Sequence, residues 1–242
     1  MTGAVRNAAT RAWAAATLGA AVLLASGTAG AQAVVGRLPE DAVMRDLNDG
    51  QRFGPFAGWL VTGRDPVGVR AKSAPIVGVR YDAYVANPFY FTMRAFLVPS
   101  THNVYLPNVA ATSNPAGTAS TNNFGLEAGF EVALTGERSW RGLQPLVNLG
   151  MGLMGGVANG FDAGGYSAGV SPLYTWGLAL RMPTGRNGEF RADLGWLVHQ
   201  VRYPNRFRTS TGDFPALRPT GSLTPLTTNR AVTVGWTWGV FR

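Results

Sequence analysis

Between Phe124 and Leu134 the chain reads FGLEAGFEVAL, and this alternating stretch decides the fold. Every second residue from Phe124 onward is apolar, whereas the intervening residues are two glycines, one alanine, Glu127 and Glu131. Successive side chains of an extended strand point to opposite faces, so a period of two predicts a β-strand with one apolar and one polar face. The class of protein then depends on which solvent each face meets.

Seven further segments of the chain alternate in the same way. They are Phe56–Thr62, Ile76–Val85, Phe89–Val98, Leu143–Leu153, Pro172–Met182, Glu189–Val201 and Ala231–Phe241. In all but the first, whose facing is ambiguous, large aliphatic and aromatic residues gather on one face. Glycine, threonine and nearly all of the charged residues lie on the other face. No stretch after residue 31 has 18 consecutive apolar residues, so no transmembrane helix is expected there.

The first 31 residues are organised like a secretory signal. Arg6 and Arg11 precede an apolar stretch, AWAAATLGAAVLLA, and small residues follow up to AGA at 29–31. This order predicts cleavage before Gln32. An uncleaved membrane anchor is the alternative, although the apolar run is too short to span a bilayer comfortably. The chain has no cysteine, which excludes a disulfide framework, thiolate chemistry and lipid attachment at an N-terminal cysteine.

The chain is basic, with 21 Lys and Arg against 13 Asp and Glu and a formal net charge of +8. Without the two arginines of the signal the charge is +6, and 242 − 31 = 211 residues remain, a size that suits one barrel or sandwich. A basic chain could bind nucleic acid, but an exported chain does not normally meet it, and no basic run or nucleic-acid motif occurs. We expect no nucleic-acid partner. Outer-membrane lipids and lipopolysaccharide are the expected partners instead.

The connections between the eight segments alternate in length. They are long at 63–75, 99–123, 154–171 and 202–230, and short at 86–88, 135–142 and 183–188. Long loops at one end and tight turns at the other are typical of an up-and-down outer-membrane barrel with periplasmic turns. A narrow eight-strand interior suits small and paired polar residues, whereas a lipid-facing wall suits bulky apolar ones. The sequence therefore predicts an all-β, eight-stranded antiparallel transmembrane barrel whose apolar faces meet lipid.

With these features the chain resembles the small outer-membrane β-barrel superfamily of Gram-negative-type bacteria, over residues 55–242. The resemblance rests on the signal, the eight segments, the loop asymmetry and the aromatic-rich last segment, AVTVGWTWGVF. It implies an outer-membrane location and insertion by the barrel-assembly machinery, which recognises a terminal aromatic residue in phase with the lipid-facing ones. Here Phe241 is penultimate, Arg242 is last, and Phe241 is out of phase with Trp238 and Val240.

Charged residues on the polar faces form a near-balanced set. The set consists of Arg80, Asp82, Arg94, Glu127, Glu131, Arg181, Glu189, Arg191 and Asp193. One interpretation is an ion-selective lumen or a carboxylate pair for acid/base chemistry. The other is a plug of paired charges, because buried charges persist only when they are paired and an eight-strand interior is just filled by side chains. We expect the plug.

Tryptophans lie on the apolar faces of the last three segments, at Trp176, Trp196, Trp236 and Trp238. They could stack on carbohydrate. Tryptophan is, however, typical of the headgroup level of membrane barrels, where its amphipathic ring sits between lipid and water. We therefore expect these four residues to be lipid-interface anchors.

Catalysis has one candidate arrangement. His199 lies on a polar face near a long loop, with Ser171 and Ser210 at the same rim, and some outer-membrane acyl enzymes use a histidine with a serine and a carboxylate. No motif connects these residues. His199 and His102 also lack metal-ligand spacing, so we expect no catalytic residues, no metal and no cofactor.

Residues 32–54 are expected to form a periplasmic segment before the barrel. Within it, PEDAVMRDLNDG at 39–50 begins with proline and acids and closes with Asn-Asp-Gly, which is typical of one short helix. A plain linker is the alternative.

The long loops are rich in cations, at Arg64, Arg70, Lys72, Arg206, Arg208 and Arg218. These cations could bind sugar-lipid phosphates or simply be solvated. The interpretation that follows is a structural or surface-interaction barrel, with an unknown extracellular ligand. A narrow small-solute channel, a lipid-modifying acyl enzyme and a soluble barrel with an apolar ligand are the alternatives.

Overall fold

The computed structural model describes residues 43–47, 50–65, 68–104, 117–159, 166, 169–184, 187–208 and 220–241. They belong to one compact unit, Leu38–Arg242. The predicted signal, at 1–31, lies outside the described residues. No helix in the described ranges has both the length and the apolar character needed to cross a membrane.

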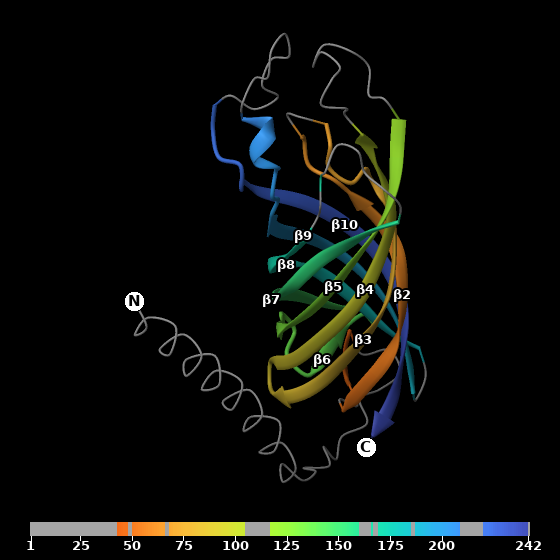
Figure 1. Cartoon of the computed structure of the whole chain (residues 1–242). Helices are drawn as coiled ribbons and strands as arrows, with labels where there is room; N and C mark the ends of the chain where they lie inside the picture. The colour runs from red at the N-terminus through yellow and green to blue at the C-terminus, as the bar shows by residue number, and fades with distance from the viewer. Residues whose placement is uncertain are drawn as a thin grey trace, which may run out of the picture. The chain divides into compact units, whose positions relative to one another are not determined.

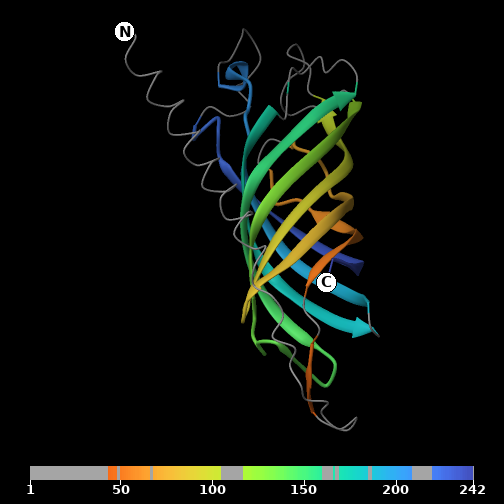
Figure 2. The same ribbon diagram turned by 90° about the horizontal axis from the view of Figure 1, so that it is seen from below.

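Eight strands form one closed barrel in the order β10-β2-β3-β4-β5-β7-β8-β9, and all neighbouring pairs are antiparallel (Figure 1). Their bounds are β2 Gln51–Val61, β3 Ala74–Ala86, β4 Phe89–Val104, β5 Gly117–Ala133, β7 Gln144–Asn159, β8 Gly169–Thr184, β9 Gly188–Gln200 and β10 Leu226–Phe241. The strands run obliquely around the barrel (Figure 2). The predicted all-β, eight-stranded antiparallel barrel is confirmed, and each of the eight alternating segments belongs to one strand.

The barrel has a turn end and a loop end. Connections at 87–88, 134–143 and 185–187 define the turn end, and those at 62–73, 105–116, 160–168 and 201–225 define the loop end. Several strands continue farther toward the loop end than the alternation predicted. The β4–β5 ladder, for example, extends from Leu97↔Phe124 to Val104↔Gly117. Polar residues occupy much of this extension, so no apolar period marks it in the sequence.

The two faces of each strand differ in the predicted sense. On β5, Glu127 and Glu131 are buried in the barrel, whereas Leu126 and Phe130 are about half exposed on its outer wall (53% and 52%). Large apolar residues are exposed on all eight strands of the barrel. The barrel thus has an apolar outside and a charged inside, the reverse of a water-soluble barrel.

A second, small sheet contradicts the helix predicted at 39–50. Within the described part of that segment, β1 (Met44–Asp46) is a strand that pairs with β6 (Arg138–Trp140) in the connection between β5 and β7. The pairing extends to Leu47, whose N–H donates to Glu137 O at 2.9 Å. A helix of a few residues is marginal in isolation, whereas the β6 edge offers backbone partners to an extended chain. Residues 39–42 and 48–49 are not described.

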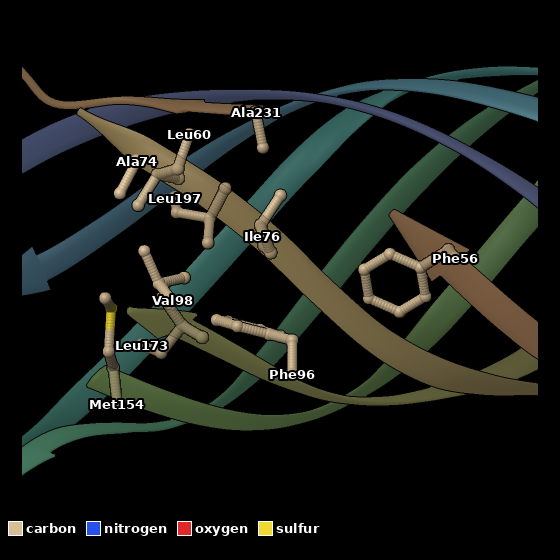
Figure 3. Close-up of a cluster of buried hydrophobic side chains, with 10 residues drawn as sticks. All are labelled: Phe56, Leu60, Ala74, Ile76, Phe96, Val98, Met154, Leu173, Leu197 and Ala231. Carbon is tan, nitrogen blue, oxygen red and sulfur yellow. The ribbon is translucent and has the colours of Figure 1, made fainter. Parts of the chain in front are cut away.

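An apolar layer fills the interior toward the loop end. Its ten buried side chains come from seven of the eight barrel strands and converge inside the barrel (Figure 3). They are Phe56, Leu60, Ala74, Ile76, Phe96, Val98, Met154, Leu173, Leu197 and Ala231. We call this set the apolar layer. It separates the charged interior from the loop end.

The end of the last strand is irregular. The register between β10 and β2 shifts between Gly239 and Phe241, so Phe241 pairs with Gln51. In the sequence, Phe241 is out of phase with Trp238 only if β10 alternates regularly to its end. The register shift interrupts that alternation. Arg242 and the side chain of Phe241 lie outside the described part of the chain.

Candidate functional site

Five charged residues meet in the middle of the barrel interior. We call Arg80, Asp82, Glu131, Arg191 and Asp193 the central charge cluster; each is at most 5% exposed. The guanidinium of Arg80 donates to Asp82 at 2.9 and 3.0 Å, to Glu131 at 3.0 Å and to Asp193 at 3.2 Å. Inward Thr92 donates to Asp82 at 2.7 Å. The cluster thus joins β3, β5 and β9 across the barrel.

The second arginine of the cluster shares the same carboxylates. Arg191 donates to Asp193 at 2.8 Å and to Glu131 Oε2, also at 2.8 Å. Glu131 therefore accepts from two arginines on different strands. Charge-assisted bonds of this kind are roughly twice as strong as neutral ones, and they offset the cost of taking the ions out of water.

A separate pair lies beside the cluster. Arg94 Nε donates to Glu127 Oε1 at 2.5 Å. The side chain of Arg94 is 11% exposed, and Glu127 Oε2 has no hydrogen-bond partner among the described residues. Glu127 is thus less completely paired than Glu131, four residues away on the same strand.

A third group lies near the turn end. Arg181 donates to Glu189 at 2.8 to 3.1 Å and to Gln144 at 2.9 Å. Arg52 also pairs with Glu189, at 3.2 Å. The guanidinium of Arg181 lies over the ring of Tyr90, 4.9 Å from its centroid, in a cation–π contact.

Among the described residues on the turn side of the apolar layer, the interior charges balance. Five arginines (Arg52, Arg80, Arg94, Arg181 and Arg191) face five carboxylates (Asp82, Glu127, Glu131, Glu189 and Asp193). Arg52 is the one absent from the sequence-predicted set. Carrying the alternation of the first segment back from Phe56 through Gly54 reaches Arg52 and would have placed it inside. Each of these carboxylates has at least one arginine partner.

Inward glycines face one another on neighbouring strands, and several of them leave no room for a side chain. Gly129 lies opposite Gly150 in the ladder between β5 and β7, and Gly177 lies opposite Gly195 between β8 and β9. A Cβ added at Gly177 would lie 2.9 Å from Asn148 Oδ1, closer than real Cβ contacts allow. The high glycine content of the chain therefore has a packing role at this level.

At the loop end, hydrogen bonds tie two long connections to the barrel. Asp65 accepts the hydroxyl proton of Tyr203 at 2.6 Å and the backbone N–H of Arg70 at 2.8 Å. Asn229 Oδ1 accepts from Arg70 Nη2 at 2.9 Å and from the backbone N–H of Gly63 at 3.0 Å. A small apolar cluster packs beside these bonds, formed by Val69, Val201, Tyr203 and Phe207.

A cavity of about 30 Å³ lies beneath this arrangement. His199 and Ser171 both line it, as do Arg70 and Lys72, and no carboxylate is among the described lining residues. Ser171 Oγ donates to the backbone of Met154 at 3.4 Å. The described residues thus place a serine and a histidine at one cavity without the acid that a Ser–His–acid set needs.

The other sequence candidates at the loop end lie apart from this pair. His102 is buried, and its ring lies 5.5 Å from that of Tyr166. Burial raises the pKa of Tyr166 to about 12, with Arg70 opposing the rise and Asp65 adding to it. Ser210 and Arg218 lie outside the described residues, as does the side chain of Arg206. Within the described ranges, no three His, Asp or Glu side chains gather as a metal would require.

The predicted interface tryptophans lie on the outer wall. Trp176 and Trp196 stack across β8 and β9, with ring centroids 4.1 Å apart and planes within 3°. Trp236 and Trp238 are 37% and 49% exposed on β10. The structure thus places these tryptophans on the apolar outer wall, as their alternation predicted.

The comparisons with known proteins found similarity in structure only. No family model and no curated protein matches the chain. Among solved structures, the outer membrane protein OprG from Pseudomonas aeruginosa has a TM-score of 0.48 and Neisserial surface protein A one of 0.49. Each is 11% identical, and each comparison covers 79% of this chain and 97% of the other.

Proposed function

We propose that this protein is an integral outer-membrane barrel with a closed interior, which acts as a structural or surface-interaction protein through its long loops. The observation that supports this proposal most strongly is the apolar outer wall around an interior of paired charges. Water-soluble barrels bury their apolar residues, because the hydrophobic effect drives that surface out of water. A wall with exposed apolar residues on every strand is stable in lipid.

The dimensions of the wall support this proposal. On β10 the outward residues are apolar from Val232 to Val240, a span of nine residues. A tilted strand needs about 9–11 residues to cross the hydrocarbon of a bilayer. The next outward position toward the loop end is Arg230, which is exposed and lies opposite Trp196. A cation beside tryptophan is typical of the headgroup level.

The interior supports a closed barrel over the alternative of a narrow channel. Guanidinium and carboxylate groups of the central charge cluster bridge strands across the lumen, and the apolar layer lies between that cluster and the loop end. A permeating ion would have to break charge-assisted bonds and then cross an apolar layer, which is costly. Conductance is therefore expected to be absent.

The proposed partners follow from the same surfaces. Exposed cations at the loop end include Arg64, Lys72, Arg208 and Arg230. They favour anionic lipopolysaccharide phosphates in the outer leaflet, because polybasic surfaces attract anionic lipid. The barrel-assembly machinery is the proposed partner during insertion. Arg70 is buried instead and belongs to the cavity, so it does not join this lipid-facing group.

Membrane fractionation tests the proposal. Native membranes are washed with alkaline carbonate, and the pelleted protein is run on gels with and without heating. We expect it to stay in the outer-membrane pellet and to change mobility on heating, as closed barrels do. Release by carbonate would indicate a soluble barrel. Single-channel conductance of the purified protein in planar bilayers would replace the closed barrel with the channel.

A further inference from the structure

The described lining of the loop-end cavity contains cations but no carboxylate. Two cations line it, Arg70 and Lys72, and no carboxylate is among its described lining residues. Arg70 is 8% exposed, and its guanidinium donates to the neutral amide oxygen of Asn229 at 2.9 Å. Asp65 lies in the same loop, but it accepts from the Tyr203 hydroxyl and from the backbone of Arg70.

The other buried arginines of the described interior differ from Arg70 in having carboxylate partners. In the described interior, Arg52, Arg80, Arg94, Arg181 and Arg191 each have a carboxylate oxygen within 3.2 Å. A guanidinium has five N–H donors and cannot lose its charge in a protein. Burying it with a neutral amide as its only hydrogen-bonded side chain among the described residues is costly, and an anion supplied from outside would offset that cost.

The rest of the cavity suits an anion with a short apolar part. His199 lines it, and the buried Nδ1 of that ring has no hydrogen-bond partner among the described residues. Ser171 adds a polar group. Leu60, Val98 and Met154, three members of the apolar layer, line its apolar side (Figure 3).

We propose that this cavity binds a small carboxylate of about acetate size. The planar carboxylate matches the planar guanidinium of Arg70, which can donate two parallel bonds to it, and the methyl group packs on the apolar floor. A volume of about 30 Å³ admits only a few heavy atoms. Lys72, exposed at the rim, raises the local concentration of anions. This binding role goes beyond the structural one and does not require the barrel to be in a membrane.

Carbon-13 NMR of labelled acetate, titrated with the full barrel in detergent, tests the site. We expect saturable broadening with the unmodified protein and a loss of affinity of about tenfold or more in Arg70→Gln, because a bond to a charged group is removed. Arg202→Gln is the matched control, since Arg202 is exposed and does not line the cavity. Equal affinity in both variants, or no saturable binding at all, would overturn the proposal.

Two further measurements keep the test decisive. Ser171→Leu fills the cavity without touching the charge of Arg70, so it should also abolish acetate binding while heat-dependent gel mobility reports a folded barrel. Retained binding in this variant would place the acetate elsewhere and contradict the proposal. Chloride should compete weakly with acetate, because a single atom cannot accept two parallel hydrogen bonds from the guanidinium as a planar carboxylate does. Chloride that competes as well as acetate would show a site for simple anions, and the carboxylate assignment would fall.

Discussion

The two halves of the barrel interior solve the same packing problem differently. Toward the turn end, five arginines and five carboxylates fill the lumen as pairs. Toward the loop end, the apolar layer fills it, and above that layer Arg70 is buried with no paired carboxylate among the described residues. A filled lumen can therefore be charged or apolar, and the two halves differ in whether their described arginines have carboxylate partners.

The largest effect is expected in the turn half, at the carboxylate shared by two arginines. Glu131→Gln leaves Arg80 and Arg191 incompletely compensated and should cost about 3–5 kcal/mol of unfolding free energy. Glu127→Gln is the matched change on the same strand and should cost less, because Glu127 has one partner and an unbonded oxygen. Urea unfolding in lipid vesicles, followed by tryptophan fluorescence, measures both. Equal costs would mean that the shared pairing has no special weight.

The apolar layer in the loop half should respond to lost volume. Leu173 is fully buried in it, and Leu173→Ala should cost about 2–5 kcal/mol. Leu178→Ala, on the same strand but on the outer wall, is the control and should cost little in lipid, which fills the space. The same unfolding assay compares the two variants. A larger loss at Leu178 would reverse the assigned faces of β8.

The wall around the two halves should show where the membrane ends. Leu149 is 70% exposed on β7, and Leu149→Arg should cost about 2–4 kcal/mol in vesicles if it lies at the bilayer midplane. Leu226→Arg, beyond Arg230 at the loop end of β10, should cost only about 0–1 kcal/mol. Similar small values for both would indicate that the wall meets water.

The smallest effect is expected where the loop end is tied together. Tyr203→Phe removes the hydrogen bond to Asp65. It should lower the free energy of local opening of this loop by about 1 kcal/mol and leave the global unfolding free energy unchanged. Tyr174→Phe, exposed on the outer wall, is the control. Hydrogen exchange of residues 201–208 measures the difference. Unchanged exchange in Tyr203→Phe would show that this bond does not hold the loop.

Much of the candidate site could be predicted, because alternation is a local property. The period of two assigned Glu131, Arg80 and Arg191 to one face of their strands, and the structure brings these residues together. Arg52 lies outside the predicted set because the alternation predicts a first segment that begins only at Phe56, four residues after it. The strand at Met44–Asp46 was missed because its partner, β6, lies about 90 residues away in the chain, and no local pattern announces such a pairing.

The sequence by itself determined eight strands, the two faces of all but the first, and the loop and turn ends, because each follows from neighbouring residues and from the lengths between them. Only the tertiary structure decided which charges pair. Arg80 and Asp193 are 113 residues apart and meet through the closure and register of the barrel. The same closure left Arg70 buried beside Asn229, 159 residues away, at a cavity without a described carboxylate. Long-range register, which no local period encodes, thus separates the half whose described charges are paired from the half in which Arg70 is buried beside an amide.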